Sequence, residues 1–508
     1  MPGGPNYKRN RFKSVHQFAR VRSPVESSLM RIQWFTRTLA GLGVVVSVAA
    51  AGQSSTPAST LVPAQVTQAL RAAGIPASHV AIVVQDVSAT RPLLAVNEDV
   101  AMNPASTMKL VTTYAGLDLL GPAYRWRTET YLNGALREGT LAGDLVVKGY
   151  GDPKLTLEAF WMLLRDLRAR GLQEIRGDLV LDRSYFSTSL HDPAQFDGAA
   201  LRPYNVGPDA LLVNFKSIRL RFLPDVSSGS ARVSAEPPIV DVVNVVRVVD
   251  GACGDWRERL TPTFQAQAAA PRVVFTGSYA AACGERDWHV ALLEPTPYVN
   301  ALFRLLWGEL GGTLSGITRE GASSPDARPY ATLESLSLAE IVRDINKYSN
   351  NVMARQLLLT IAAEQGGAPG TEEKGQRAIK SWLAAKGLPI PELVMENGAG
   401  LSRVERISAR SLTTLLVAAY RSPVMPELMA SMPLVAMDGT MRRRMKGASI
   451  AGQAHIKTGS LADTRAIAGY VLDRAGRRYA VTMIVNHPNA QLAQAAQDTL
   501  LNWVYELN

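Results

Sequence analysis

The stretch Pro104-Ala105-Ser106-Thr107-Met108-Lys109 combines the start of a helix with two reactive side chains. Proline is favoured at the first position of a helix, and apolar residues then recur at helical spacing, at Met108, Val111, Ala115 and Leu119. A three-residue spacing places the Ser106 hydroxyl and the Lys109 amine on one face of the helix, one turn apart. This geometry suits a nucleophile and its base, provided that burial or a second cation lowers the pKa of the lysine.

Two further motifs carry similar chemistry. Ser349-Asn350-Asn351 lies between two helical patterns and offers a hydroxyl and an amide, although Ser and Asn in such a place are also typical of a helix cap. Lys457-Thr458-Gly459-Ser460 follows a strand-like segment and offers a fixed cation, two hydroxyls and a glycine that lets a substrate backbone approach. Each motif alone is weak evidence. The three together, in this order, indicate a serine-based acyl-transfer site.

Around these motifs, helical and β-rich stretches alternate along the chain. Residues 80–85 have the pattern of a short buried strand before the Ser106 helix, and long helices return from residue 333. Between them, residues 124–325 hold many short strands, including the near-repeats Gly143-Asp144-Leu145-Val146 and Gly177-Asp178-Leu179-Val180. The chain ends in a hairpin pattern and a terminal helix. We therefore expect an α/β (α+β) domain split by a large β-rich insertion.

The expected division begins with an N-terminal extension and signal peptide at residues 1–51. The rest divides into one domain that carries the three motifs and two smaller inserted domains, the second of them rich in β-strands. Their expected boundaries are, in that order, 52–123 with 326–508, 124–221 with 289–325, and 222–288.

The formal net charge of +10 is concentrated at the N-terminus. The first 51 residues contain eight basic residues and one acidic residue, so the rest of the chain carries only +3. This removes most of the electrostatic case for nucleic-acid binding, while +3 stays compatible with an anionic polymer. Arg31 and Arg37 precede an apolar run that ends in Ala49-Ala50-Ala51, the pattern of a secretory signal cleaved after Ala51. The alternatives are an uncleaved membrane anchor and a translation start at Met30.

The two cysteines predict a disulfide, because Cys253 and Cys283 lie in one β-rich region of an exported chain; two buried free thiols are the alternative. Two cysteines cannot build a structural zinc site, and the six histidines do not cluster, so we expect no metal. Activated serine chemistry needs no cofactor, and the sequence has no Gly-rich phosphate loop. We therefore expect no cofactor either.

With these motifs, the sequence resembles the class C low-molecular-weight penicillin-binding proteins, the D-alanyl-D-alanine carboxypeptidase/endopeptidase family of the penicillin-binding protein 4 type. Four longer landmarks strengthen the resemblance: Gly151-Asp152-Pro153-Lys154-Leu155, Tyr204-Asn205-Val206-Gly207-Pro208, Asn397-Gly398-Ala399-Gly400-Leu401-Ser402-Arg403 and Asp438-Gly439-Thr440. The separation of 243 residues between Ser106 and Ser349 matches the family's insertion of two extra domains, which β-lactamases lack. The resemblance implies a penicillin-binding, β-lactamase-like transpeptidase fold for the domain with the three motifs.

The resemblance also implies catalytic roles for five residues. Ser106 attacks the carbonyl between two D-alanines and forms an acyl-enzyme, with Lys109 as general base. Ser349 relays a proton to the leaving amine, and Asn351 holds the substrate amide. Lys457 supplies the positive charge that keeps Lys109 neutral. Each role fits the donor and acceptor capacity of its side chain.

Five further residues are implied in substrate binding. The hydroxyls of Thr458 and Ser460 bind the terminal carboxylate on either side of Gly459, and the backbone N–H groups of Ser460 and the nucleophilic serine form the oxyanion hole. Arg403 borders the same pocket. Some family members use an acid from the insertion to bind the free amine of a diaminopimelate side chain, and Asp197 lies near that stretch. The sequence before Asp197 lacks the tryptophan-rich pattern of those members, so an exposed loop aspartate is the alternative.

The resemblance further implies peptidoglycan stem peptides as substrates, β-lactam antibiotics as covalent inhibitors and a periplasmic location. Membrane association is expected only as a peripheral contact or through an uncleaved N-terminus. Removal of a terminal D-alanine and cleavage of a cross-link both cut a D-alanyl bond, so both activities stay open. The alternatives are a β-lactamase, for which no water-activating base is evident, and a catalytically silent wall-binding scaffold, against which the intact motifs argue.

Overall fold

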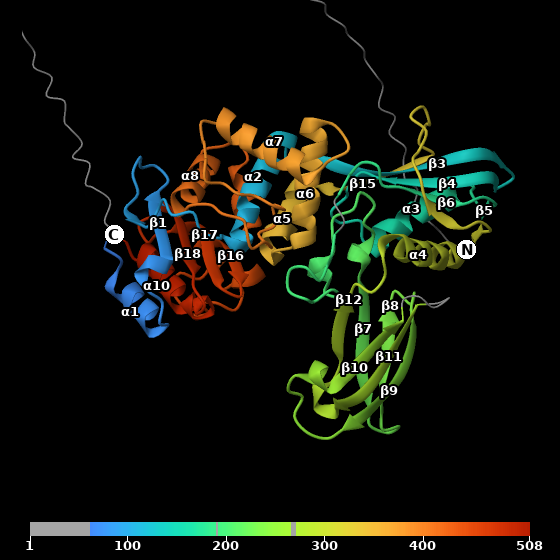
Figure 1. Cartoon of the computed structure of the whole chain (residues 1–508), viewed down its shortest axis with the longest axis horizontal. Helices are drawn as coiled ribbons and strands as arrows, with labels where there is room; N and C mark the ends of the chain where they lie inside the picture. Colours follow the sequence, from blue (N-terminus) through green and yellow to red (C-terminus); the bar gives the residue numbers. More distant parts are fainter. Residues whose placement is uncertain (1–60, 189–190, 266–270, 508) are drawn as a thin grey trace, which may run out of the picture. The chain divides into compact units, whose positions relative to one another are not determined.

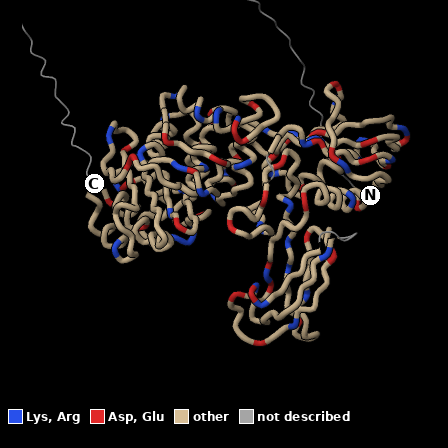
Figure 2. Tube along the Cα trace, in the orientation of Figure 1, with Lys and Arg blue, Asp and Glu red and all other residues tan. Residues whose placement is uncertain are grey.

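The computed structural model describes residues 61–188, 191–265 and 271–507, so the expected signal segment lies outside the described residues. Within the described part, no helix combines the length and apolar character needed to cross a membrane. The same residues contain no group of His, Cys, Asp and Glu side chains that could hold a metal ion. Acidic and basic residues are interspersed along the trace and do not gather on one element (Figure 2).

A five-stranded antiparallel sheet forms the centre of the region that carries the three motifs (Figure 1). Its order is β16 (Ala454–Leu461), β17 (Thr464–Leu472), β18 (Arg478–Asn486), β1 (Val80–Asp86) and β2 (Leu94–Val96). Strand β1 pairs with β18 along its whole length, with Val80 opposite Val485 and Asp86 opposite Tyr479. The two parts of the chain that flank the insertion therefore meet in one sheet.

Helices cover both faces of this sheet (Figure 1). Successive residues of a strand point to opposite faces, so Ile467 and Val471 of β17 join one core while Ala468 and Tyr470 join another. The first core contains α1 (Ala64–Ala72) and α10 (Gln494–Tyr505). The second contains α2 (Lys109–Leu120), α5 (Leu338–Tyr348), α6 (Asn351–Gly366), α7 (Glu372–Ala385), α8 (Ala409–Tyr420) and α9 (Met425–Ser431). Helix α2 is buried continuously from Lys109 to Leu117, so its first lysine begins inside a helical layer.

A seven-stranded sheet follows α2 in the chain. It contains β3 (Arg125–Arg137), β4 (Thr140–Gly149), β5 (Glu174–Ile175), β6 (Leu179–Asp182), β13 (Thr313–Leu314), β14 (Thr318–Glu320) and β15 (Ala331–Ser337). The two near-repeats of the sequence run parallel beside each other, since Leu145 in the middle of β4 pairs with Leu179 at the start of β6. Helices α3 (Leu157–Ala169) and α4 (Pro295–Glu309) pack against the sheet in a shared core.

Strand β15 differs from the expected division of the chain. We expected residues 326–508 to belong to the domain with the three motifs, but β15 pairs antiparallel with β3 in the seven-stranded sheet. The strand runs directly into α5, where Ser337 and Glu340 form a capping box. One short segment therefore serves the sheet of the insertion and then starts a helix of the other layer.

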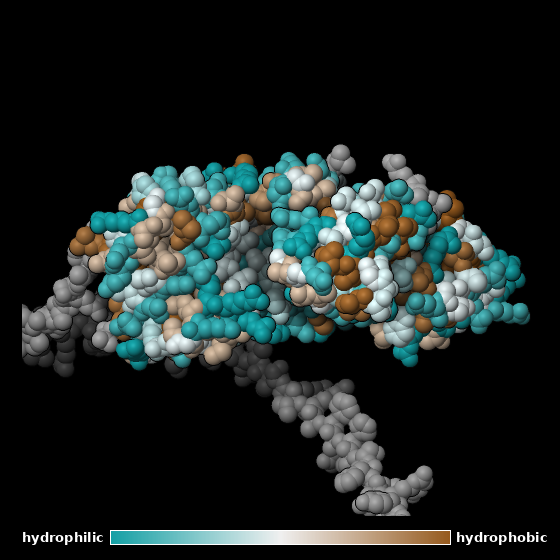
Figure 3. All heavy atoms as spheres, turned by 90° about the horizontal axis from the view of Figure 1, so that it is seen from below, coloured by the Kyte–Doolittle hydropathy of each residue, from teal (hydrophilic) through white to brown (hydrophobic). Residues whose placement is uncertain are grey.

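The third sheet has six strands and spans residues 218–290. It contains β7 (Ile218–Asp225), β8 (Ser230–Glu236), β9 (Asp241–Val249), β10 (Leu260–Gln265), β11 (Arg272–Ala280) and β12 (Arg286–Val290). Five aromatic residues contact one another within it: Phe222, Trp256, Phe275, Tyr279 and Trp288. Leu223, Val226 and Val245 of this region are exposed, and apolar residues are scattered among polar ones on the face in Figure 3.

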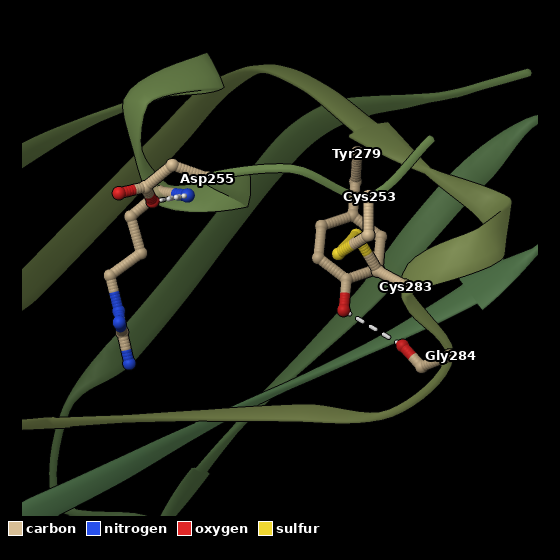
Figure 4. The surroundings of a disulfide bond; sticks show 6 residues. Cys253, Asp255, Tyr279, Cys283 and Gly284 are labelled. Carbon is tan, nitrogen blue, oxygen red and sulfur yellow. Dashed lines mark hydrogen bonds between the residues drawn. A yellow bond between two sulfur atoms is a disulfide. The ribbon is translucent and has the colours of Figure 1, made fainter. Parts of the chain in front are cut away.

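Cys253 and Cys283 form a disulfide in this sheet, as the sequence predicted (Figure 4). Cys253 precedes the short helix η5 (Trp256–Arg259), and Cys283 ends η6 (Ala281–Cys283) just after β11. The hydroxyl of Tyr279 donates a hydrogen bond to the Gly284 carbonyl at 2.7 Å. The disulfide therefore ties the long connection after β9 to the end of β11.

The insertion is joined to the helical layer by polar contacts on α5 and α6. The side chain of Gln356 accepts a hydrogen bond from the Asp209 amide at 2.9 Å and donates one to the Asp209 carbonyl at 2.9 Å. Lys154 forms an ion pair with Asp344 of α5 at 2.6 Å. These contacts attach the insertion to the two helices that flank the Ser349 motif.

Candidate active site

The three motifs meet at the N-terminal end of α2. Ser106 lies in the short helix η2 (Ala105–Met108), which continues directly into α2. The Lys109 amine donates to Ser106 Oγ at 3.0 Å and to Asn351 Oδ1 at 2.7 Å. It also donates to the backbone carbonyl of Ala399. The Lys109 side chain is fully buried, and its three hydrogen-bond partners among the described residues are neutral oxygens.

The second amine of the site belongs to Lys457 on β16. It donates to Ser349 Oγ at 2.9 Å and to the Thr458 carbonyl at 2.8 Å. Lys457 is fully buried, like Lys109. The site thus contains two pairs of a serine hydroxyl and a buried lysine amine.

Burial controls the protonation of both amines. It is the main cause that holds the pKa of Lys109 well below its ordinary value, and the positive charge of Lys457 lowers that pKa further. Burial also lowers the pKa of Lys457 to about 7. A lysine with a lowered pKa is neutral in a large fraction of molecules near neutral pH and can accept a proton from a serine hydroxyl.

The backbone around both serines is strained. Ser349 ends α5 in the left-handed conformation with φ 58°, and Ala105, immediately before Ser106, has φ 46°. Non-glycine residues rarely adopt this conformation, which costs on the order of 1–3 kcal/mol and clusters at functional sites. Asn350 caps α6 by accepting from the Met353 amide at 3.0 Å. The Ser349-Asn350-Asn351 segment is therefore both a helix cap and a contributor to the site.

Two glycines allow the backbone of the site to pack closely. A Cβ at Gly400 would lie 1.9 Å from the Ala105 carbonyl oxygen, and Gly400 itself has φ 73°. A Cβ at Gly459 would lie 2.7 Å from the Pro104 carbonyl oxygen and 3.0 Å from the Ser106 amide nitrogen. Strand β16 and the 396–400 loop thus both touch the backbone of Ser106.

The hydroxyls of β16 have protein partners of their own. Thr458 Oγ1 shares a hydrogen bond of 2.7 Å with Thr440 Oγ1. Ser460 Oγ accepts from the guanidinium of Arg465, its partner across the hairpin, at 2.7 Å. Asp438, beside Thr440 in sequence, forms an ion pair of 2.7 Å with Lys347 near the end of α5. The strand, the Asp438-Gly439-Thr440 segment and the α5 terminus are thereby held together.

Arg403 and Asp197 lie outside this cluster of contacts. The Arg403 guanidinium is 4.8 Å from the ring centre of Phe196 and 3.5 Å from Asp463, in the turn between β16 and β17. A cavity of about 460 Å³ lies beside Arg403 and is lined partly by Phe196, Arg355 and Glu372. The Asp197 carboxylate accepts hydrogen bonds from Tyr204 at 2.6 Å and from Asn205 at 2.8 Å. Asp197 is thus held within its own loop.

Sequence reasoning did not assign roles to Glu405, Thr440 or Arg465. Glu405 lies two residues after Arg403, the last residue of one landmark. Thr440 is the last residue of the landmark Asp438-Gly439-Thr440. Arg465 lies opposite Ser460 through the pairing of β16 with β17, a hairpin that the sequence analysis did not predict. Glu405 had no local signal, because its contacts depend on the folded shape of the 396–400 loop.

Comparisons with known proteins agree on one family. Residues 62–507 match the model of the D-Ala-D-Ala carboxypeptidase 3 (S13) family. A D-alanyl-D-alanine carboxypeptidase of Actinomadura sp. (strain R39) is 28% identical over 436 residues, which cover 82% of this chain and 80% of that protein. The D-alanyl-D-alanine carboxypeptidase DacB of Haemophilus influenzae is 24% identical over 414 residues, which cover 80% of this chain and 85% of that protein.

The structural comparison agrees in fold. The crystal structure of penicillin binding protein 4 from Haemophilus influenzae matches with a TM-score of 0.72 at 23% identity, over 87% of this chain and 99% of that chain. The predicted fold class, a penicillin-binding α/β fold with a large β-rich insertion, is confirmed. Because the family model matches nearly all of the described residues, this chain belongs to the D-Ala-D-Ala carboxypeptidase 3 (S13) family.

Proposed function

We propose that this chain is a serine-type D-Ala-D-Ala carboxypeptidase that cleaves peptidoglycan stem peptides through an acyl-enzyme on Ser106. Family membership supports the class of reaction. The observation that carries the proposal is the fully buried Lys109 amine at 3.0 Å from Ser106 Oγ. A neutral amine at this distance is within reach of the proton that the hydroxyl must lose.

In the acylation step, Ser106 Oγ forms a bond to the carbonyl carbon between two D-alanines, and its proton passes to Lys109. The resulting oxyanion accepts hydrogen bonds from the backbone N–H groups of Ser106 and Ser460. The C–N bond then breaks, and the leaving amine takes up, through Ser349, the proton that Lys109 had accepted, so Lys109 is neutral again. Lys457 contacts Ser349 at 2.9 Å. Asn351 bonds Lys109 and offers its amide N–H₂ to the substrate.

In the deacylation step, water attacks the ester carbonyl and gives its proton to Lys109. The bond to Ser106 Oγ breaks, and the oxygen takes back that proton from Lys109, so the enzyme returns to its starting state. The terminal carboxylate of the substrate binds the hydroxyls of Thr458 and Ser460, next to the positive charge of Arg465. Gly459 leaves room for the substrate backbone between them.

Four finer assignments belong to the same proposal. The enzyme also acts as a DD-endopeptidase on cross-links, since both reactions cut a D-alanyl bond. It is exported to the periplasm after cleavage of a signal peptide, and any membrane contact is peripheral or through an uncleaved N-terminus. Arg403, which lines the cavity, and Asp197, next in sequence to the lining residue Phe196, contribute to substrate binding. The two inserted domains comprise the seven-stranded and six-stranded sheets.

The nucleophile is tested by labelling the chain from Gly52 onward with a fluorescent penicillin, beside Ser106→Ala. We expect a stable adduct that peptide mass analysis locates on Ser106 and that the variant lacks. Release of D-alanine from a synthetic pentapeptide should be lost in the same variant. A folded wild-type protein that neither forms the adduct nor releases D-alanine would contradict the proposal.

The role of Asp197 needs a separate comparison. Asp197→Asn should lower kcat/KM for a peptide with a free side-chain amine more than for the same peptide with that amine acetylated. Equal effects on the two peptides would assign Asp197 to the loop alone, where Tyr204 and Asn205 already bind it.

A further inference from the structure

Glu405 organises the loop that binds the Lys109 amine. One oxygen of its carboxylate, Oε1, accepts three backbone hydrogen bonds, from the amides of Glu396, Asn397 and Gly398 at 3.1, 3.0 and 3.1 Å. The next residue in the loop is Ala399, whose carbonyl accepts from Lys109. Glu405 is fully buried, and burial raises the pKa of its carboxyl group. The three N–H donors on one oxygen and the nearby Lys109 act in the opposite direction and favour the ionised carboxylate. Its position therefore determines where the Ala399 carbonyl lies.

The same loop is fixed to the helix that carries Lys109. Thr112, one turn after Lys109 on α2, donates from its hydroxyl to the Gly398 carbonyl at 2.7 Å. The Ala399 amide donates to Asn397 Oδ1 at 2.9 Å. The Ala399 carbonyl is thus held against Lys109 by contacts on both sides of it.

A buried cation lies near Glu405 on the neighbouring helix. Arg355 stands one turn after Asn351 on α6 and is only 8% exposed. Among the described residues, neither Arg355 Nε nor Glu405 Oε2 has a hydrogen-bond partner. Arg355 Nε and Glu405 Oε2 therefore influence nearby groups through charge and not through a hydrogen bond.

Charged groups act on the Lys109 amine from three places: Lys457 on β16, Arg355 on α6, and Glu405 in the segment after the 396–400 loop. Burial is the main cause that lowers the pKa of Lys109; Lys457 and Arg355 lower it further, and Glu405 opposes them. Arg355 itself faces Glu405, Glu396 and Glu372. Removal of Glu405 or of Arg355 should therefore change the protonation of Lys109 in opposite directions.

We propose that Glu405 is a positioning residue for Lys109. It holds the 396–400 loop so that the Ala399 carbonyl anchors the amine, and its negative charge offsets that of Arg355 at the same amine. This inference rests on the proposed role of Lys109 as the base of acylation.

The test measures the acylation rate with a fluorescent penicillin across pH for wild type, Glu405→Gln, Arg355→Gln and the double variant. Loss of the carboxylate makes protonated Lys109 less stable, so in Glu405→Gln the midpoint of the acidic limb should move to lower pH. Loss of the guanidinium should move it to higher pH, and the double variant should lie between them. Glu405→Gln should also lower the plateau rate, because an amide oxygen accepts three N–H bonds less well than a carboxylate does.

Two additional variants separate charge from shape. Glu405→Asp keeps the charge on a shorter side chain, so its midpoint should stay near wild type while its plateau falls. Glu392→Gln removes a carboxylate that accepts from Ser411 at 2.6 Å and Ser408 at 3.3 Å, and its pH profile should match wild type.

Opposite shifts of the acidic midpoint in Glu405→Gln and Arg355→Gln support the inference. Unchanged midpoints, or shifts in the same direction, overturn it. If Glu405→Gln does not fold, the Arg355→Gln and Glu405→Asp profiles decide the question by the same criteria. A wild-type protein that penicillin does not acylate would instead count against the proposed function.

Discussion

Gly459 offers a sharp test of how closely the strand β16 must approach Ser106. In Gly459→Ala, the new methyl group would lie 2.7 Å from the Pro104 carbonyl oxygen, 3.0 Å from the Ser106 amide nitrogen and 3.1 Å from the Ala105 Cβ. Two of these three atoms belong to backbone and cannot rotate away. The strand or the η2 segment must therefore move.

The required movement sets the expected loss of activity. Ordinary contact begins near 3.4 Å, so the 2.7 Å approach has to open by about 0.7 Å. A misplacement of about 1 Å at a reacting centre costs roughly 100-fold in rate, and loss of one oxyanion-hole donor costs about 10²–10³-fold. We expect Gly459→Ala to lower the acylation rate by roughly 10- to 100-fold. The added methyl group should cost only about 1–3 kcal/mol of stability.

The assay is the rate of labelling by fluorescent penicillin, with thermal unfolding measured in parallel. Gly308→Ala is the matched control: it adds the same methyl group on α4, where nothing lies within 4 Å of the new Cβ. This control should keep the wild-type rate and gain up to about 1 kcal/mol of helix stability. A Gly459→Ala protein that is folded and labelled at the wild-type rate would refute the reasoning.

Three further expectations concern stability and substrate binding. Joint replacement of Cys253 and Cys283 by alanine opens a loop with a sequence separation of 30 residues, so thermal unfolding should show a loss of about 3.5 kcal/mol while penicillin labelling persists. The pKa of Lys457 is about 7 in the folded protein and near its ordinary value in the unfolded chain. The unfolded state therefore binds more protons than the folded state between about pH 7 and 10, so the free energy of unfolding rises with pH in that range. Lys457→Met should remove up to about 1.4 kcal/mol per pH unit from that rise, measured by urea unfolding at about pH 7 and 9; an unchanged slope would contradict the burial argument. Arg465→Ala should raise KM for a peptide with a free terminal carboxylate by about tenfold, the value of one hydrogen bond to a charged group. The check is the same peptide with a C-terminal amide, for which KM should rise less.

The sequence predicted those features that depend on local pattern. The helix after Pro104 follows from the spacing of its apolar residues, and the contact between Ser106 and Lys109 follows from their separation of one turn. The cysteine pair could be predicted because export and an even count leave few alternatives. The fold class was implied by the family resemblance, which rests on the three motifs in order, the longer landmarks and the length of chain between the first and second motifs.

Other features depend on contacts between distant segments. The transfer of β15 to the sheet of the insertion could not be predicted, because its alternating pattern suits any sheet with one buried face. The close approach of Gly459 to Ser106 depends on the placement of β16 beside η2, which no local pattern encodes. Arg355 reads as an ordinary polar residue of a helix until the fold buries it.

The chemistry of the site follows from what surrounds its amines. Among the described residues, neither Lys109 nor Lys457 forms an ion pair with a carboxylate; their partners are serine hydroxyls, an amide oxygen and backbone carbonyls. A direct carboxylate partner would stabilise the charged amine and make it a poor base, whereas neutral oxygens orient the amine without holding its proton. Glu405 comes close enough to shape the Ala399 loop, yet it is separated from Lys109 by that loop. The fold thus keeps this buried carboxylate in a supporting position and leaves Lys109 free to take the proton of Ser106.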